Sequence, residues 1–132
     1  MRLHELIDTA LQYRSRARAP YSQFPVGAAL ETRKGKAFGG CNVENSSFGL
    51  TMCAERVAIW KALSEGETEF RRLVVVTDTA SLTPPCGACR QIIWENCGDI
   101  QIILCNLRGA RTKHRMSELL PLPFDGSFLV GA

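Results

Sequence analysis

Residues 73–105 have the sequence LVVVTDTASLTPPCGACRQIIWENCGDIQIILC, in which two apolar runs flank a helical segment. The first run, Leu73–Val76, is continuously apolar, and the second, Ile100–Cys105, is apolar except at Gln101. Such runs are typical of strands covered on both faces. Prolines before the helical segment and a glycine after it predict a helix from Cys86 to about Asn96. Two strands joined through a helix predict a βαβ unit with parallel strands and a right-handed crossover.

The flanking sequence adds further elements to this unit. Apolar residues recur at helical spacing near the N-terminus, and two short runs joined by a glycine turn predict a β-hairpin. The expected elements are a helix at 3–17, strands at 26–32 and 36–42, a loop at 43–51, a helix at 51–64, a turn at 106–113 and a short helical turn at 117–120. Their order, α-β-β-α-β-α-β, predicts an α/β protein whose mixed sheet carries helices on both faces.

The overall composition fits one globular domain over residues 1–132. Apolar types make up 45% of the chain and charged types 22%, close to the average for such domains. The 16 basic and 13 acidic residues leave a net charge of +3, too small an excess to predict nucleic-acid binding. No apolar run approaches the ~20 residues of a membrane helix, and charges interrupt the first eight residues, unlike a secretory signal. These features favour a cytoplasmic protein without a membrane or nucleic-acid partner.

The six cysteines indicate thiolate chemistry, because disulfides do not persist in the reducing compartment that we expect. Cys86 and Cys89 are three residues apart at a helix start, so both sulfurs can reach one zinc ion at ~2.3 Å. Cys53 lies near the start of the preceding predicted helix, 33 positions before Cys86. Helix N-termini stabilise anions, so three thiolates at two helix starts predict one bound Zn²⁺ per chain.

The predicted zinc site has an open position, because three protein ligands leave the fourth position to solvent, as in catalytic zinc sites. Water in that position becomes a hydroxide nucleophile near neutral pH. Glu55, two residues after Cys53, can lie beside the metal without coordinating it, as a proton shuttle requires. Three thiolates and Zn²⁺ sum to a charge of −1, so we expect Arg56, Arg90 or both to compensate it by hydrogen bonds to a ligand sulfur.

Other roles for the cysteines stay open at this point. Cys86 and Cys89 alone could form a redox pair, but Cys53 and Glu55 would then have no role. A closed structural zinc site, in a module that binds a partner protein, would need a fourth ligand. The candidates for that ligand are Cys41, Cys97, Cys105, His4 and His114. These cysteines are better explained as small buried apolar residues and the histidines as surface residues.

Two motifs resemble a known enzyme class. Cys53-Ala-Glu-Arg and Pro85-Cys-Gly-Ala-Cys-Arg-Gln are similar to the signature of the zinc nucleoside deaminases, some of which use three cysteine ligands. Further segments that resemble the small homotetrameric cytidine deaminases are Phe24-Pro-Val-Gly-Ala-Ala-Leu, Cys41-Asn-Val-Glu-Asn and Ser117-Glu-Leu-Leu-Pro. The resemblance covers residues 3–124 and implies a three-layer α-β-α sandwich with a mixed sheet of about five strands.

The resemblance implies a reaction: hydrolytic deamination of cytidine and deoxycytidine to uridine and deoxyuridine, with release of ammonia, in pyrimidine salvage. Cys53, Cys86 and Cys89 would hold zinc, and Glu55 would carry the proton from the zinc-activated hydroxide to the base and the leaving amine. A related deaminase that acts on a modified cytosine nucleoside, such as the blasticidin type, looks similar around the zinc.

The resemblance also implies how a nucleoside would bind. Phe24 would pack on the pyrimidine, and Asn42 and Glu44 would hydrogen-bond the ribose hydroxyls. Backbone groups of Ala54 and Cys86 would hold the base carbonyl. The grip on a free sugar favours a nucleoside over a polynucleotide.

Three residues fall where the family completes each site from neighbouring subunits of a homotetramer. They are Ser46, Phe48 and Phe124. The family usually has alanine and tyrosine where this chain has Ser46 and Phe48. Phe48 lacks the tyrosine hydroxyl, so one polar contact to a neighbour or to the sugar is lost.

Overall fold

A five-stranded mixed sheet forms the centre of the computed structural model, which describes residues 1–129. The strands are β1 (Gly27–Thr32), β2 (Ala37–Cys41), β3 (Phe70–Val76), β4 (Gln101–Cys105) and β5 (Arg111–Arg115). Their spatial order is β2-β1-β3-β4-β5; β3 and β4 are parallel, and the other neighbouring pairs are antiparallel. The predicted hairpin and the parallel strand pair within residues 73–105 are confirmed.

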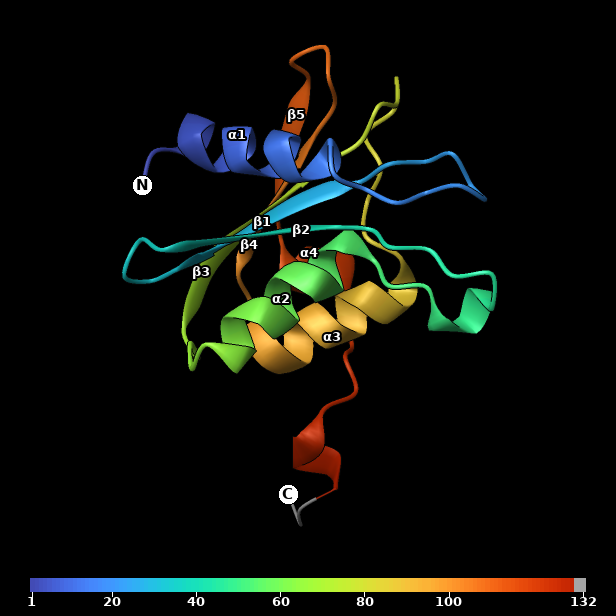
Figure 1. The fold of residues 1–132 in the computed structure, drawn as a ribbon. Helices are drawn as coiled ribbons and strands as arrows, with labels where there is room; N and C mark the ends of the chain where they lie inside the picture. The colour runs from blue at the N-terminus through green and yellow to red at the C-terminus, as the bar shows by residue number, and fades with distance from the viewer. Residues whose placement is uncertain (130–132) are drawn as a thin grey trace.

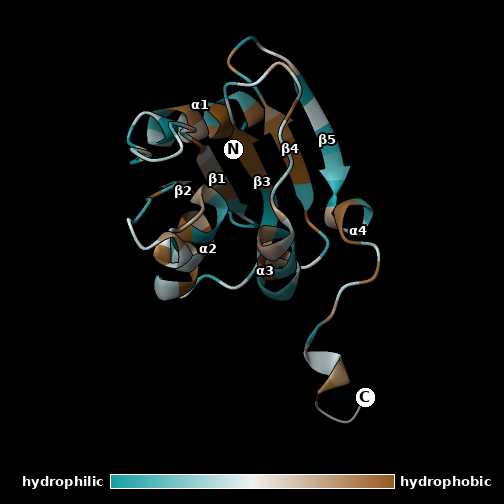
Figure 2. Cartoon of the chain, turned by 90° about the vertical axis from the view of Figure 1, so that its right-hand side faces the viewer, coloured by the Kyte–Doolittle hydropathy of each residue, from teal (hydrophilic) through white to brown (hydrophobic). Residues whose placement is uncertain are grey.

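Helices cover both faces of this sheet (Figure 1). They are α1 (Leu3–Arg14), α2 (Ala54–Ser64), α3 (Gly87–Cys97) and α4 (Met116–Leu119), with short 3₁₀ turns at Phe48–Leu50 and Gly126–Phe128. α1 packs on one face, whereas α2 and α3 lie side by side on the other (Figures 1 and 2). The three-layer α-β-α sandwich is therefore confirmed. Within residues 1–129, no helix has both the length and the apolar character that crossing a membrane demands.

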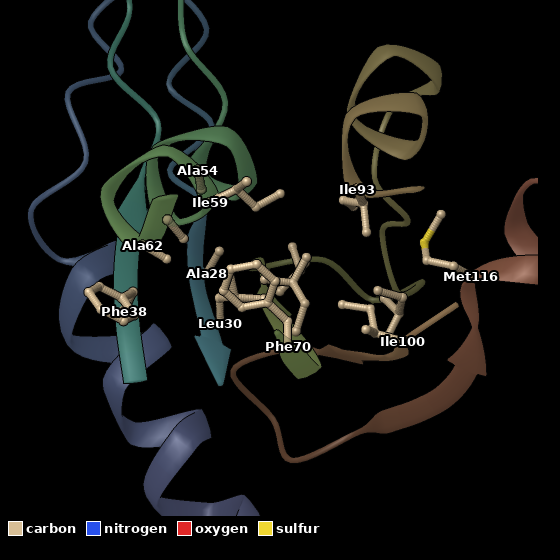
Figure 3. Close-up of a cluster of buried hydrophobic side chains, with 14 of the residues drawn as sticks. Ala28, Leu30, Phe38, Ala54, Ile59, Ala62, Phe70, Ile93, Ile100 and Met116 are labelled. Carbon is tan, nitrogen blue, oxygen red and sulfur yellow. The ribbon is translucent and has the colours of Figure 1, made fainter. Parts of the chain in front are cut away.

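Each face of the sheet buries its own apolar cluster. The cluster under α2 and α3 is the larger one and includes Leu30, Ile59, Phe70, Ile93 and Met116 (Figure 3). The cluster under α1 contains Leu6, Ala10, Ala29, Val74, Val76, Ile103 and Cys105. Successive residues of a strand point to opposite faces, so a strand covered on both sides must be apolar at every position. This explains the continuous apolar runs in β3 and β4.

The prediction of a turn over residues 106–113 was wrong at its C-terminal end, because Arg111–Arg115 form the edge strand β5. β5 pairs with β4 from Cys105 opposite Arg111 to Gln101 opposite Arg115. Its five side chains are all polar, and charged side chains are common on edge strands because they discourage pairing with other chains. A strand without apolar residues carries no alternating pattern, so the sequence gives no sign of it.

Three predicted boundaries also move by three residues, whereas the other predicted helix and strand ends agree within one residue. α1 ends at Arg14 rather than residue 17, and β3 begins at Phe70, three residues before the apolar run. α2 begins at Ala54 rather than Thr51, because Cys53 has the extended backbone of a helix cap (φ −78°, ψ 152°).

Gly40 in β2 lets the start of α2 lie directly against the sheet. A Cβ atom at Gly40 would lie 2.4 Å from the carbonyl oxygen of Ala54 and 2.6 Å from the amide nitrogen of Ala58. Only glycine fits without movement of the helix. Since Ala54 follows Cys53, this close approach determines where the first turn of α2 lies.

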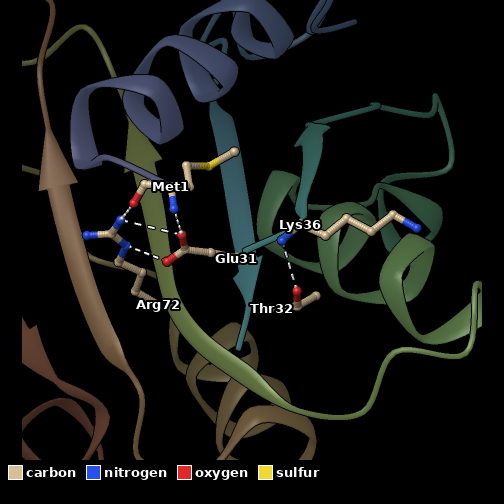
Figure 4. A network of polar contacts seen from close by, with 5 residues as sticks. All are labelled: Met1, Glu31, Thr32, Lys36 and Arg72. Atoms are coloured by element: carbon tan, nitrogen blue, oxygen red, sulfur yellow. Dashed lines mark hydrogen bonds and ion pairs between the residues drawn. The ribbon is translucent and has the colours of Figure 1, made fainter. Parts of the chain in front are cut away.

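A buried ion pair joins β1 to β3 near the chain start (Figure 4). Arg72 Nε donates to Glu31 Oε1 at 2.7 Å, and the Glu31 side chain is fully buried. Arg72 Nη2 also donates to the Met1 carbonyl oxygen at 2.7 Å, and the Met1 amino group lies 3.6 Å from Glu31 Oε2. Beside this pair, the amide of Lys36 donates to Thr32 Oγ1 at 3.0 Å and closes the β1–β2 turn.

Candidate active site

The structure brings together the three cysteines that the sequence analysis selected. Cys53 caps α2, Cys86 caps α3, and Cys89 lies in the first turn of α3. Their sulfur atoms all lie within 4.8 Å of one another. Four tetrahedral ligands at the Zn–S distance of ~2.3 Å would stand ~3.8 Å apart, so the cluster fits one zinc ion with small adjustments.

The surroundings of the cluster suit an anionic ligand set. Both helices direct their N-termini toward it, and the amide of Cys89 donates to Cys86 Sγ at 3.4 Å. Within residues 1–129, no other histidine, cysteine or carboxylate joins the cluster, so the closed four-ligand site has no fourth ligand there. A hydrogen bond with the Cys89 thiol lowers the pKa of Cys53 to about 6 against the opposing effect of burial, with help from Arg56 and Cys86. The same hydrogen bond and burial raise the pKa of Cys89.

The two arginines next to the ligands have different surroundings. Arg56 Nε is buried and has no hydrogen-bond partner in the described part of the chain. Burial alone would lower the pKa of Arg56, but hydrogen bonding to Cys89 and the charges of the three cysteines outweigh it and raise that pKa. Arg90 donates from Nε to the Pro85 carbonyl oxygen at 2.8 Å and from Nη1 to the Leu119 carbonyl oxygen at 2.9 Å. It therefore joins the start of α3 to the end of α4.

Glu55 is the acidic group beside the cluster. It lies in the first turn of α2, two residues after Cys53, and is only 5% exposed. Burial, with a contribution from the charge of Cys53, raises the pKa of Glu55 to about 7 against the opposing effects of its own backbone amide and of Arg56. A carboxyl group with a pKa near neutrality can both give and take a proton at physiological pH.

A cavity of about 250 Å³ opens in front of the cysteines and Glu55. The residues from α2, α3 and the segments before them that line it are Thr51, Met52, Cys53, Ala54, Glu55, Thr83, Pro84, Cys86 and Cys89. The rest of its lining comes from Ser22, Phe24, Val26, Asn42, Glu44, Val75 and Thr77. The cavity thus contains Phe24, Asn42, Glu44 and Ala54, which sequence analysis placed around a nucleoside.

Asn42 and Glu44 form hydrogen bonds with the segment around residues 21–26, which forms one wall of this cavity. Asn42 Oδ1 accepts from the Val26 amide and Asn42 Nδ2 donates to the Phe24 carbonyl oxygen, both at 2.9 Å. Glu44 Oε1 accepts from the amides of Tyr21 and Ser22 at 3.0 Å each, and its Oε2 accepts from the Ser22 hydroxyl. The hydrogen bonds from Ser22, and then from Tyr21, hold the pKa of Glu44 below its usual value. Both side chains are therefore fixed before any ligand binds.

Ser46, Phe48 and Phe124 do not line the cavity. Ser46 is exposed, and Phe48 is 72% exposed with its ring edge-on to Tyr21 at a centroid distance of 5.7 Å. Phe124 stacks on Phe128 at 5.8 Å in the C-terminal segment, which extends away from the sandwich (Figures 1 and 2). Within one chain these three residues and the metal centre are separate.

Several cavity residues were missed by the sequence analysis. They are Ser22, Val26, Thr51, Met52, Val75, Thr77, Thr83 and Pro84. Val75 and Thr77 lie at the carboxyl end of β3, where ligands bind in sheets with parallel strands. That position could have indicated them, whereas nothing in the sequence marks the others.

A buried carboxyl group beside a three-ligand metal centre is the combination that zinc enzymes use to activate water. Placed at helix starts in an α-β-α sandwich, it defines a zinc-dependent hydrolase. Comparison with known proteins narrows this class.

Residues 1–105 match the family model described as cytidine and deoxycytidylate deaminase zinc-binding region. The chain is 49% identical over 120 residues to a cytidine deaminase of Halalkalibacterium halodurans. This alignment covers 90% of this chain and 91% of that protein. A crystal structure of cytidine deaminase from Burkholderia pseudomallei matches with a TM-score of 0.91 and 45% identity, over 94% of this chain and 100% of that one. The chain belongs to the cytidine and deoxycytidylate deaminase family, whose zinc-binding region includes all three clustered cysteines.

One relative corresponds to the alternative substrate class. A blasticidin-S deaminase of Bacillus cereus is 32% identical over 107 residues, which is 75% of this chain and 76% of that protein. The identity is lower and the aligned region shorter than for the Halalkalibacterium halodurans protein, so the comparison favours cytidine.

Proposed function

We propose that this chain, as a single catalytic domain over residues 1–132, hydrolyses cytidine and deoxycytidine to uridine and deoxyuridine with release of ammonia. The observation that carries the proposal is the meeting of Cys53, Cys86 and Cys89 within 4.8 Å beside buried Glu55, at a cavity of about 250 Å³. The relatives named cytidine deaminases support the same substrate class.

The metal centre would be held by the three cysteine sulfurs, one Zn²⁺ per subunit. Zinc bound there supplies Lewis acidity for hydrolytic attack on the pyrimidine. Arg56 offsets the negative charge of the thiolates, because its guanidinium is always positively charged and lies close enough to all three cysteines for their charges to raise its pKa. Arg90 contributes a positive charge at the start of α3 while it fixes the backbone around Cys86 through the Pro85 carbonyl oxygen.

Glu55 moves the protons of the reaction. With its pKa near 7, it takes a proton from the attacking water and gives it to N3 of the cytosine ring. It then takes the proton of the hydroxyl group formed at C4 and gives it to the amine, which departs as ammonia. Glu55 is thus the catalytic acid and base.

The substrate would lie with its base between Phe24 and the cysteines. Phe24 packs on the pyrimidine, and backbone groups of Ala54 and Cys86 hold the base carbonyl. Asn42 and Glu44 face the sugar, and their fixed geometry leaves little entropy to lose when the ribose hydroxyls bind.

The assembly would be a homotetramer in which neighbouring subunits cover exposed apolar groups and complete each site. Phe48, Phe124 and Leu122 are 72%, 57% and 94% exposed, and Phe124 stacks on Phe128, which is also exposed. Exposed apolar residues that group together mark interaction surfaces. Ser46 lies on the same exposed loop as Phe48. The small net charge of +3 agrees with a free nucleoside as substrate and with a role in cytoplasmic salvage rather than nucleic-acid binding.

The test is an ultraviolet assay of purified protein with cytidine, deoxycytidine, cytosine, CMP and blasticidin S, with zinc measured on the same sample. We expect turnover of the two nucleosides. The variant Glu55→Gln should keep one zinc per chain and lose nearly all turnover. Turnover of blasticidin S without cytidine, or full activity of Glu55→Gln, would contradict the proposal.

A further inference from the structure

Three threonine hydroxyls form a chain along one wall of the cavity. Thr77 Oγ1 lies 3.0 Å from Thr79 Oγ1, which lies 3.1 Å from Thr83 Oγ1. Thr77 directly follows β3, and Thr83 lies three residues before Cys86. The two end residues line the cavity and the middle one does not. Both ends of this hydroxyl chain therefore lie at the same cavity.

The hydroxyl chain has one proton that its own hydrogen bonds do not use. Each hydroxyl carries one proton and two lone pairs, so three hydroxyls linked by two hydrogen bonds keep one proton for an outside acceptor. Within residues 1–129, the three hydroxyls have no hydrogen-bond partners other than each other. Thr77 is only 1% exposed, and a buried donor without an acceptor is unfavourable. The spare proton is thus available to a molecule in the cavity.

The donor-to-acceptor direction of the hydrogen bonds in the hydroxyl chain can be reversed. When the Thr77 end donates into the cavity, the Thr83 end has only lone pairs to offer, and rotation of the three hydroxyls exchanges the two ends. Deamination makes the matching exchange in the ligand, because the amino group of cytosine is a donor and the carbonyl oxygen of uracil that replaces it is an acceptor.

We propose that Thr77, Thr79 and Thr83 position the ligand on both sides of the reaction, by accepting a hydrogen bond from the cytosine amino group and donating one to the uracil carbonyl oxygen. This inference rests on the proposed function. Thr77 and Thr83 would contact the ligand, and Thr79 would act through them as a positioning residue.

The backbone around the hydroxyl chain is anchored independently of it. Asn106 Nδ2 donates to the Thr79 carbonyl oxygen at 3.0 Å, and the Thr77 amide donates to the Cys105 carbonyl oxygen at 3.1 Å. Replacing Thr79 by valine removes the middle hydroxyl and keeps the shape of the side chain and both anchors. That change interrupts the hydroxyl chain without substituting a residue that lines the cavity.

The experiment compares Thr79→Val, Thr77→Val, the double variant and Thr79→Ser, with Thr112→Val on β5 as a matched control far from the cavity. We measure kcat and KM for cytidine, the inhibition constant of uridine, zinc content and Tm. Each valine variant should lower kcat/KM and weaken uridine binding by about tenfold, the effect of one lost hydrogen bond. The double variant should be no worse than either single one, and Thr79→Ser should restore both constants.

Two results would overturn the inference. One is a kcat/KM for Thr79→Val within twofold of the parent value at full zinc content. The other is a loss in Thr79→Val that Thr79→Ser does not restore, or that follows a fall in zinc content or Tm, since either marks a structural effect. If Thr77→Val does not fold, the valine and serine variants of Thr79 still decide. A parent protein that binds zinc without deaminating cytidine would instead contradict the proposed function itself.

Discussion

Gly40→Ala should damage the active site from a position outside it. The new Cβ would lie 2.4 Å from the Ala54 carbonyl oxygen, so the start of α2 must retreat by about 1 Å to regain ordinary contact at 3.4 Å. Overpacking of this kind costs about 1–3 kcal/mol. With an unfolding entropy of about 2.1 cal/mol/K per residue over 132 residues, this lowers Tm by about 4–11 °C.

The same displacement should reduce activity, because Cys53 and Glu55 lie in the part of α2 that moves. A misplacement of about 1 Å can cost about 100-fold in rate. Differential scanning calorimetry, zinc analysis and the cytidine assay measure the three consequences. Gly126→Ala is the matched control, since nothing lies within 4 Å of a Cβ at Gly126. A Gly40→Ala variant with the Tm and kcat of the parent would refute the reasoning.

Two further predictions concern charged side chains. Arg72→Met removes the hydrogen-bonded partner of the buried Glu31 carboxylate and leaves it only the Met1 amino group at 3.6 Å, so it should lower the free energy of unfolding by about 3–5 kcal/mol in urea titrations. Arg115→Met breaks an exposed pair with Asp99 and should stay within about 1 kcal/mol of the parent; equal losses would contradict this. Because the pKa of Glu44 is lowered below 4.5 in the folded protein, its stabilising effect is present above pH 4.5 and is lost as the pH falls through the lowered pKa. The parent should therefore be more stable than Glu44→Gln at pH 7 but not at pH 3, and a difference that persists at pH 3 would count against this assignment.

The sequence predicts most of the fold because most of it follows from apolar periodicity. β3 and β4 each end in four consecutive apolar residues, and α1 carries its apolar residues at helical spacing. Apolar periodicity cannot predict β5, because each of its residues is polar and it forms a strand only through backbone pairing with β4. Only the tertiary structure supplies that partner.

The residues of the candidate active site also fall into those that the sequence could indicate and those that it could not. Cys53, Cys86 and Cys89 could be selected from the sequence, because their positions at predicted helix starts already imply that their side chains can lie close together. The partners of Arg90 could not, since the Leu119 carbonyl oxygen comes from a distant segment. The hydroxyl chain through Thr79 is also invisible in sequence, because threonine is common and its contacts depend on how the segment after β3 folds back.

Zinc K-edge X-ray absorption on fully active protein examines the metal centre directly. Our account predicts one zinc per chain, with three sulfur neighbours at about 2.3 Å and one oxygen neighbour from solvent. Four protein ligands around the ion, or full cytidine turnover by protein that contains no zinc, would contradict it.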